Sequence, residues 1–262
     1  MEREALRIGL IGYGTIGQDV ARLLAERVEK DMVLVGALVR NPIKARPPGQ
    51  TIFPTLSELL SMRPHVVVEV AGHEGLRAHG SRVLRAGIDL IFISAGVLAE
   101  SETSSELLAA AQHGGAQMKL VSGAIGGLDA LAAASLGGLT RVIHTMCKPP
   151  EALLPSEEAS RVVTVCEVFR GTARQAALRF PEFLNVAAAV ALAGAGFDQT
   201  EVRVLADPTL QYTRHEILAE GAFGLFRFEI ENATNIPQRG ARLVALSIIH
   251  ALLQRRAAFI IG

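Results

Sequence analysis

The 262-residue sequence has no tryptophan, only two tyrosines and two cysteines, and no excess of charge of either sign. Lys and Arg together number 26, as do Asp and Glu, so the net charge gives no reason to expect a nucleic-acid partner. The cysteines, Cys147 and Cys166, have neither the spacing of a metal site nor the density of a disulfide-stabilised domain. We therefore expect no metal site, no nucleic-acid partner and two free thiols in a reducing compartment.

Long hydrophobic runs are also missing, although half of the residues are hydrophobic. No run in the sequence reaches the roughly 18 to 20 apolar residues that a membrane-spanning helix needs. The charged residues 1–4 lead directly into an apolar segment and leave no room for a signal peptide. We expect no membrane contact and a cytoplasmic location. The length suffices for one large or two medium domains with a buried core.

The most informative segment that is present is residues 8–17, where an apolar strand leads into a glycine-spaced turn that opens a helix. In such a turn the first glycine permits a tight bend, the second lets a phosphate approach the backbone, and the third lets the helix pack against the strand. The start of the helix adds unpaired N–H groups and a partial positive charge. The alternative is a structural turn without a ligand. We expect a dinucleotide pyrophosphate to contact Gly12, Gly14, Thr15, Ile16 and Gly17.

Residues 1–122 alternate strand-like and helix-like segments, the pattern of a parallel sheet with helices on both faces. We expect strands at 6–11, 32–39, 65–70, 89–94 and 117–122. We expect helices at about 15–30, 56–62, 75–86 and 103–113. The pattern predicts an α/β fold whose N-terminal, dinucleotide-binding domain is a doubly wound parallel sheet of the Rossmann type.

The pattern changes at a second glycine-rich turn, residues 122–129, which leads into an alanine-rich helix. Longer β-type runs follow, at 140–147, 161–169, 201–206, 211–218 and 223–231, with helices at about 172–179 and 185–195. They predict a second, α+β domain over residues 123–238, which carries a mixed or antiparallel sheet and serves substrate binding, catalysis and dimerisation. The apolar stretch 239–262 has helical spacing, and we expect this C-terminal helix to pack back on the first domain.

Two strand ends of the first domain concern the choice of cofactor. The strand at 32–39 ends without the carboxylate that would bind the ribose hydroxyls of NAD. Arg40 follows instead, and its guanidinium suits the 2′-phosphate of NADP, which makes NADP at least as favoured as NAD; the alternative is a solvated loop residue. After the strand at 65–70, Ala71 and Gly72 are small enough to let a nicotinamide ribose pass close to the backbone.

His215 is the candidate catalytic residue of the second domain. It lies on a strand-like run, and a histidine exchanges a proton near neutral pH or hydrogen-bonds a substrate carboxylate or carbonyl. A buried structural histidine is the alternative at this stage.

Several stretches occur in the order found in one family and together span almost the whole chain. They are residues 12–17, 69–73, 122–130, 185–188, 206–208, His215 and 221–224. In them the sequence resembles the L-aspartate dehydrogenases. The resemblance implies reversible NAD(P)-dependent conversion of L-aspartate to iminoaspartate, then to oxaloacetate and ammonia. It also implies Ala124 and Asn185 as cofactor contacts, His215 as the active-site residue, and a homodimer.

The sequence departs from the family pattern at Thr213, at residues 181–184 and at residues 235–240. Two lysines that help to hold a dicarboxylate are thereby missing, and Arg214 or Arg239 would have to replace them. A related enzyme that acts on a different amino acid or imine therefore stays open as an alternative, as does a non-catalytic NADP-binding homologue. A semialdehyde dehydrogenase would need a nucleophilic cysteine, and neither cysteine opens a helix that would lower its pKa.

Overall fold

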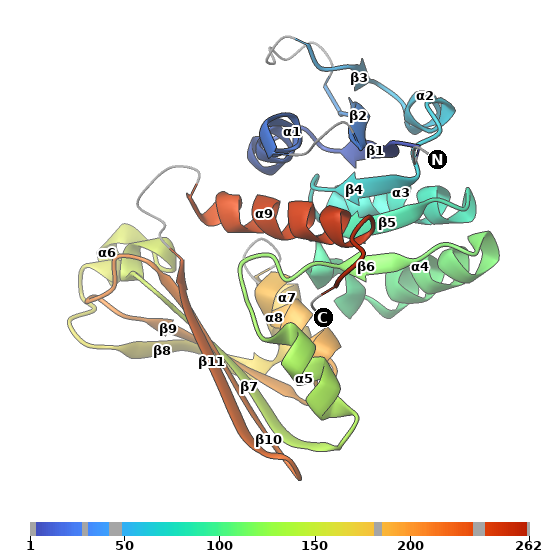
Figure 1. The fold of residues 1–262 in the computed structure, drawn as a ribbon. Helices are drawn as coiled ribbons and strands as arrows, with labels where there is room; N and C mark the ends of the chain where they lie inside the picture. The colour runs from blue at the N-terminus through green and yellow to red at the C-terminus, as the bar shows by residue number, and fades with distance from the viewer. Residues whose placement is uncertain (1–3, 28–30, 42–48, 181–184, 233–238, 261–262) are drawn as a thin grey trace. The chain divides into compact units, whose positions relative to one another are not determined.

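The computed structural model describes residues 4–27, 31–41, 49–180, 185–232 and 239–260 (Figure 1). The chain divides into two compact units. The first unit comprises residues 1–123 and 241–261, and the second comprises residues 124–240. No helix among the described residues is long and apolar enough to cross a membrane.

The first unit is built on a parallel sheet of six strands in the order β3-β2-β1-β4-β5-β6. The strands are β1 (Leu6–Ile11), β2 (Met32–Leu38), β3 (Ile52–Phe53), β4 (Val66–Glu69), β5 (Asp89–Phe92) and β6 (Met118–Leu120). The strand order reverses between β1 and β4, which is where doubly wound sheets bind their ligands. The predicted Rossmann-type fold is confirmed, with β3 as an additional short strand.

Helices cover both faces of this sheet. They are α1 (Thr15–Arg27), α2 (Leu56–Ser61), α3 (His73–Arg85), α4 (Ser101–Gly114) and α9 (Arg239–Gln254), with a 3₁₀ turn, η1, at Ala95–Ala99. Side chains alternate along each strand, so that neighbouring residues enter different cores. Leu10 and Val68 contribute to the core with α1 and α9, whereas Ile11 and Val67 contribute to the core with α2, α3 and α4.

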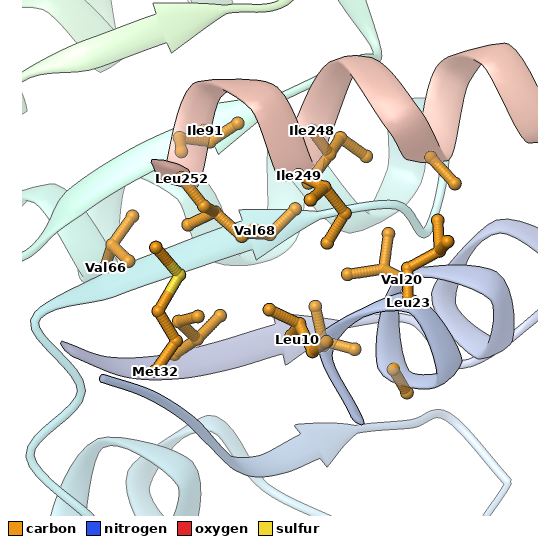
Figure 2. Close-up of a cluster of buried hydrophobic side chains, with 14 of the residues drawn as sticks. Leu10, Val20, Leu23, Met32, Val66, Val68, Ile91, Ile248, Ile249 and Leu252 are labelled. Atoms are coloured by element: carbon orange, nitrogen blue, oxygen red, sulfur yellow. The ribbon is translucent and has the colours of Figure 1, made fainter. Parts of the chain in front are cut away.

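The C-terminal helix α9 supplies one wall of the first of these cores. Ile248, Ile249 and Leu252 recur at helical spacing and are buried. Figure 2 shows them beside Val68 on β4 and Leu23 on α1. Full burial of one such aliphatic side chain contributes roughly 1.5–3 kcal/mol, so α9 is an integral part of the first unit.

The second unit contains a mixed sheet of five strands in the order β11-β10-β7-β9-β8. The strands are β7 (Leu139–Lys148), β8 (Cys166–Thr172), β9 (Thr200–Ala206), β10 (Thr213–Gly221) and β11 (Gly224–Asn232). The pair β7 and β9 is parallel and the other pairs are antiparallel, as predicted for a mixed sheet. The helices are α5 (Leu128–Ser135), α6 (Ser156–Ala159), α7 (Ala173–Arg179) and α8 (Asn185–Ala193), with a 3₁₀ turn, η2, at Pro150–Ala152.

One face of the second sheet is buried beneath helices. Ile217 and Ala219 of β10 and Val142 of β7 form a core with Leu131 of α5 and Val190 of α8. Every second residue of β9 and β10 is buried, which is the alternation of a sheet with one covered face. The candidate residue His215 is one of the buried residues in this alternation.

Candidate functional site

The glycine-rich turn between β1 and α1 has three glycines with different roles. Gly12 has a φ of +98°, and a Cβ there would lie 2.8 Å from the carbonyl oxygen of Val70. A Cβ on Gly17 would lie 2.7 Å from the carbonyl oxygen of Gly12. These two glycines are therefore required by the contacts of the protein with itself.

Gly14 is different, because no atom of the described residues lies within 4 Å of the position of an added Cβ. The backbone is exposed here, directly before Thr15 begins α1. The first N–H groups of a helix have no partners within the helix and attract anions. The turn thus offers an open approach to a phosphate group, and these residues fit a dinucleotide.

The loop after β4 is held by a buried carboxylate that sequence reasoning did not single out. Oε1 of Glu69 accepts hydrogen bonds from the backbone N–H groups of Ala71 and Gly72, at 2.7 and 2.8 Å. Glu69 is fully buried, and this burial raises its pKa against the opposing effect of those hydrogen bonds. Gly72, with a φ of +87°, then leads into α3. The carboxylate fixes the two small residues that were predicted to line the cofactor site.

Arg40 lies just beyond β2 and forms an ion pair with Glu74, in the first turn of α3, at 3.1 Å. Both side chains are more than four-fifths exposed. An ion pair at such an exposed position contributes only about 0–1 kcal/mol of stability. Breaking it so that the guanidinium can bind a ligand phosphate therefore costs little free energy. The structure thus places an acidic side chain beside Arg40, the residue predicted to make NADP at least as favoured as NAD.

His215 lies on the covered face of the second sheet and is buried there, with 4% of its surface exposed. In the antiparallel register of β10 and β7, His215 is opposite Met146 and Ile217 is opposite His144. Residues two apart on a strand share a face, so His144 and Lys148 of β7 are on the face of His215. The sheet therefore brings together two imidazoles and a lysine.

The two imidazoles contact each other directly. Nε2 of His144 lies 3.2 Å from Nδ1 of His215, and the rings stack with their centroids 5.3 Å apart. His144 is completely buried. Its Nδ1 has no hydrogen-bond partner among the residues that the structure describes.

Burial controls the charge of this cluster. It lowers the pKa of His215 to about 4, and the nearby Lys148 ammonium acts in the same direction. Burial also holds the pKa of His144 well below its usual value, with His215 as the second cause, and lowers the pKa of Lys148. Both imidazoles are therefore neutral near pH 7.

The glycine-rich turn at residues 122–129 is tied to the same sheet. Nδ2 of Asn232 donates a hydrogen bond to the carbonyl oxygen of Ala124 at 2.9 Å. Asn232 on β11 is directly opposite Thr213 on β10, two residues before His215. The side-chain amide of Asn232 thus lies across from Thr213, one of the positions where the sequence departs from the family pattern. Asn185, a predicted cofactor contact, is the first residue of α8 in the same unit.

Arg214 does not replace the missing lysines on the face of His215. Neighbouring residues on a strand point to opposite faces, and Arg214 lies 3.8 Å from the sulfur of Cys147 and 3.9 Å from the Asp207 carboxylate on the other face. Lys148 is a cation on the face of His215, and the sequence alone did not indicate it. The side chain of Arg239 and residues 181–184 and 235–238 lie outside the described parts of the chain.

The thiols do not form a nucleophilic site. Burial raises the pKa of Cys147, with the Arg214 guanidinium opposing it, so the thiol is protonated near neutral pH. Cys166 begins β8 and opens no helix. Among the described residues no three His, Cys, Asp or Glu side chains are grouped to hold a metal ion.

Comparisons with known proteins cover both units. Residues 12–120 match the family "Homoserine dehydrogenase, NAD binding domain", and residues 129–255 match the family "Aspartate dehydrogenase, C-terminal". The chain is 44% identical to the L-aspartate dehydrogenase of Ruegeria pomeroyi, over 98% of this chain and 95% of that protein. It is 39% identical to the L-aspartate dehydrogenase of Ralstonia nicotianae, over 97% of this chain and 98% of that protein.

Solved structures show the same fold. The aspartate dehydrogenase of Thermotoga maritima matches with a TM-score of 0.81 and 26% identity, over 99% of this chain and 100% of that one. A homoserine dehydrogenase from Thiobacillus denitrificans matches with a TM-score of 0.62 at 17% identity, over 97% of this chain and 75% of that one. The second likeness concerns the fold alone.

Proposed function

Because the chain belongs to the L-aspartate dehydrogenase family, we propose that it catalyses the NAD(P)-dependent oxidative deamination of L-aspartate. The reaction is reversible and yields iminoaspartate, which water converts to oxaloacetate and ammonia. The observation that carries the proposal is the buried cluster around His215, within a chain that aligns with aspartate dehydrogenases over 98% of its length.

The first unit, with α9 packed on it, holds the dinucleotide in this proposal. Gly12, Gly14, Thr15, Ile16 and Gly17 surround the pyrophosphate, and the space at Gly14 supports this role. Ala71 and Gly72, fixed by Glu69, line the path of the nicotinamide ribose. The second unit adds cofactor contacts of its own, from Ala124 and Asn185. A nicotinamide held by these residues would supply the acceptor for the hydride on the Cα of the amino acid.

Arg40 makes NADP at least as favourable a cofactor as NAD. Its guanidinium is exposed at the end of β2, where a carboxylate would select NAD. A 2′-phosphate would compete with Glu74 for this guanidinium, so Glu74 moderates the preference. Cofactor selectivity then depends on the balance between two anionic groups at one cation.

Two side chains of the second unit handle the substrate. The Lys148 ammonium attracts a carboxylate of the dicarboxylic acid on the face of the sheet that also carries His215. His215 contacts the reacting end of the substrate and orients it for hydride transfer. Lys148 thus supplies a positive charge in place of the two lysines that the sequence lacks relative to the family pattern.

The deciding experiment is a spectrophotometric assay of NADH and NADPH oxidation with ammonia and a panel of 2-oxo acids that includes oxaloacetate. Turnover of oxaloacetate with one oxidised cofactor per product, lost in His215→Ala with cofactor binding retained, supports the proposal. Turnover of a different 2-oxo acid would show that the substrate is not aspartate. The departure from the family pattern at Thr213 is compatible with that outcome. Cofactor binding without turnover of any acid would leave a non-catalytic NADP-binding homologue.

We also propose that the enzyme is a cytoplasmic homodimer. Symmetric dimers are the commonest oligomers, and the hairpin between β10 and β11 exposes the apolar side chains of Phe223 and Leu225. Two unpaired cysteines agree with a reducing compartment. Light scattering coupled to gel filtration measures the mass, and a monomer mass at enzyme working concentration would reject the dimer.

A further inference from the structure

The contact between the two buried histidines carries a further inference, which rests on the proposed function only for the identity of the ligand. We propose that His144 is a positioning residue, which donates its Nε2–H to Nδ1 of His215 and so holds an N–H at Nε2 of His215 toward the substrate. His144 itself touches no ligand in this proposal. Its effect on the reaction passes through the ring of His215.

The two strands fix this contact in space. His144 and His215 are 71 residues apart in the sequence but lie on paired antiparallel strands. A nitrogen-to-nitrogen distance of 3.2 Å between two imidazoles requires one of them to carry the shared hydrogen. Because His144 contacts Nδ1 of His215, Nε2 of His215 is the ring nitrogen that is not engaged by His144.

The direction of the hydrogen bond follows from the other nitrogen of His144. If His215 donated the hydrogen, the proton of neutral His144 would sit on Nδ1, which is buried and has no acceptor among the described residues. Buried N–H groups without an acceptor are rarer than buried acceptors without a donor. If His144 donates, both rings carry their protons on Nε2, which is the tautomer that predominates for histidine in water. Both considerations favour His144 as the donor.

The same arrangement opposes a positive charge on His215. An imidazolium carries hydrogens on both nitrogens, so its Nδ1–H would meet the Nε2–H of His144. His144 could yield only by moving its own proton to the buried Nδ1. The titratable groups facing His215 among the described residues are His144 and Lys148 of β7, and the lysine ammonium also disfavours a second cation.

The chemical consequence is a change in the role of His215. A neutral ring with its hydrogen on Nε2 donates a hydrogen bond to a carboxylate, a carbonyl oxygen or an imine nitrogen of the substrate. It polarises that group without passing a proton to it, as a neutral histidine does in other enzymes. The imidazole is then an electrostatic and orienting group.

The first test is nitrogen NMR of the wild-type protein labelled with ¹⁵N at histidine, with His215→Asn used to assign the signals. The two nitrogens of a neutral imidazole differ strongly in shift according to which one carries hydrogen. We expect Nε2 of His215 to be protonated and Nδ1 to be bare throughout the range from about pH 6 to 8. A hydrogen on Nδ1 of His215 would overturn the proposal. This readout needs no substrate, so it is independent of whether the protein oxidises aspartate.

The second test uses variants of His144. His144→Leu removes the donor at similar size, His144→Gln restores an N–H, and Val142→Ala changes another buried side chain of β7, opposite Ala219, as the control. We expect kcat to fall about 10- to 100-fold in the leucine variant, with the Kd for NADPH unchanged and the His215 nitrogens shifted. The glutamine and control variants should stay within about threefold of wild type. Equal losses of kcat in the glutamine and leucine variants would show a structural role and reject positioning by a donor.

Discussion

The buried neutral histidine predicts a specific loss of stability in mild acid. The pKa of His215 is about 4 in the folded protein, against an ordinary value of 6.5. Above pH 6.5 the ring is neutral in both states, and the folded protein has its full stability. As the pH falls from 6.5 toward 4, the unfolded chain takes up a proton that the native state refuses, so the free energy of unfolding decreases. Below about pH 4 both states are protonated and the loss is complete.

The magnitude follows from the difference of about 2.5 pKa units, at about 1.4 kcal/mol each. The total loss attributable to His215 is about 3.5 kcal/mol, a large share of the 5–15 kcal/mol that is typical of a domain. Because the ring is almost fully buried, screening by solvent reduces this value little. His144, whose pKa is displaced in the same direction, adds to the loss.

The assay is urea unfolding of wild type, His215→Asn and His113→Asn at several values between about pH 7.5 and 4.5. His113 is an exposed histidine of α4 and serves as the matched control. We expect the His215 variant to lose about 2–3 kcal/mol less than wild type across this range, and the control to follow wild type. Parallel curves for wild type and the His215 variant would refute the conclusion that His215 is buried in its neutral form.

Three further predictions concern ligand binding and the stability of the glycine-rich turn. Lys148→Met should raise the KM for oxaloacetate at least about 10-fold with little change in the Kd for NADPH, and an unchanged KM would remove Lys148 from the carboxylate site. Gly17→Ala should lower thermal stability, because its Cβ would lie 2.7 Å from a carbonyl oxygen, whereas Gly14→Ala should fold normally and weaken cofactor binding in a fluorescence titration. Glu74→Gln should tighten the binding of NADPH relative to NADH, and Arg40→Ala should weaken the binding of NADPH relative to NADH. Equal ratios of the two Kd values in wild type and both variants would show that the ion pair does not select the cofactor.

Much of the fold could be predicted because it depends on local periodicity. The strands from β1 to β6 other than β3 fall within the predicted ranges, since apolar runs between helical segments mark them clearly. β3 has two residues and is too short for any period to be visible. β8 begins at Cys166 rather than at residue 161, because its first bonded partner is Ala206, at the end of β9. Pairing between strands, rather than propensity, set that boundary.

The candidate site was predictable only in part, for the same physical reason. His215 could be singled out as a histidine on a strand-like run, but its partner His144 lies 71 residues away and is found only through the register of β7 and β10. Lys148 is likewise placed near His215 only by the register of these two strands. The orientation of Arg214 follows from strand alternation once His215 is known to be buried. The role of Glu69 depends on a turn of the backbone that brings two N–H groups to one oxygen, and no sequence period reveals such a turn.

Because α9 packs on the first unit, this unit cannot complete its core until the end of the chain has been synthesised. The ribosome releases β1 to β6 early, but the apolar surface that receives Ile248, Ile249 and Leu252 stays uncovered until the last residues emerge. More than a hundred residues separate β6 from α9. Their synthesis takes about 6 to 24 s at rates of about 5–20 residues per second. During that time the apolar surface that α9 later covers is exposed on the nascent first unit and is a binding site for a chaperone. A frameshift or stop codon that removed α9 would spare the glycine-rich turn and still leave a protein prone to aggregation.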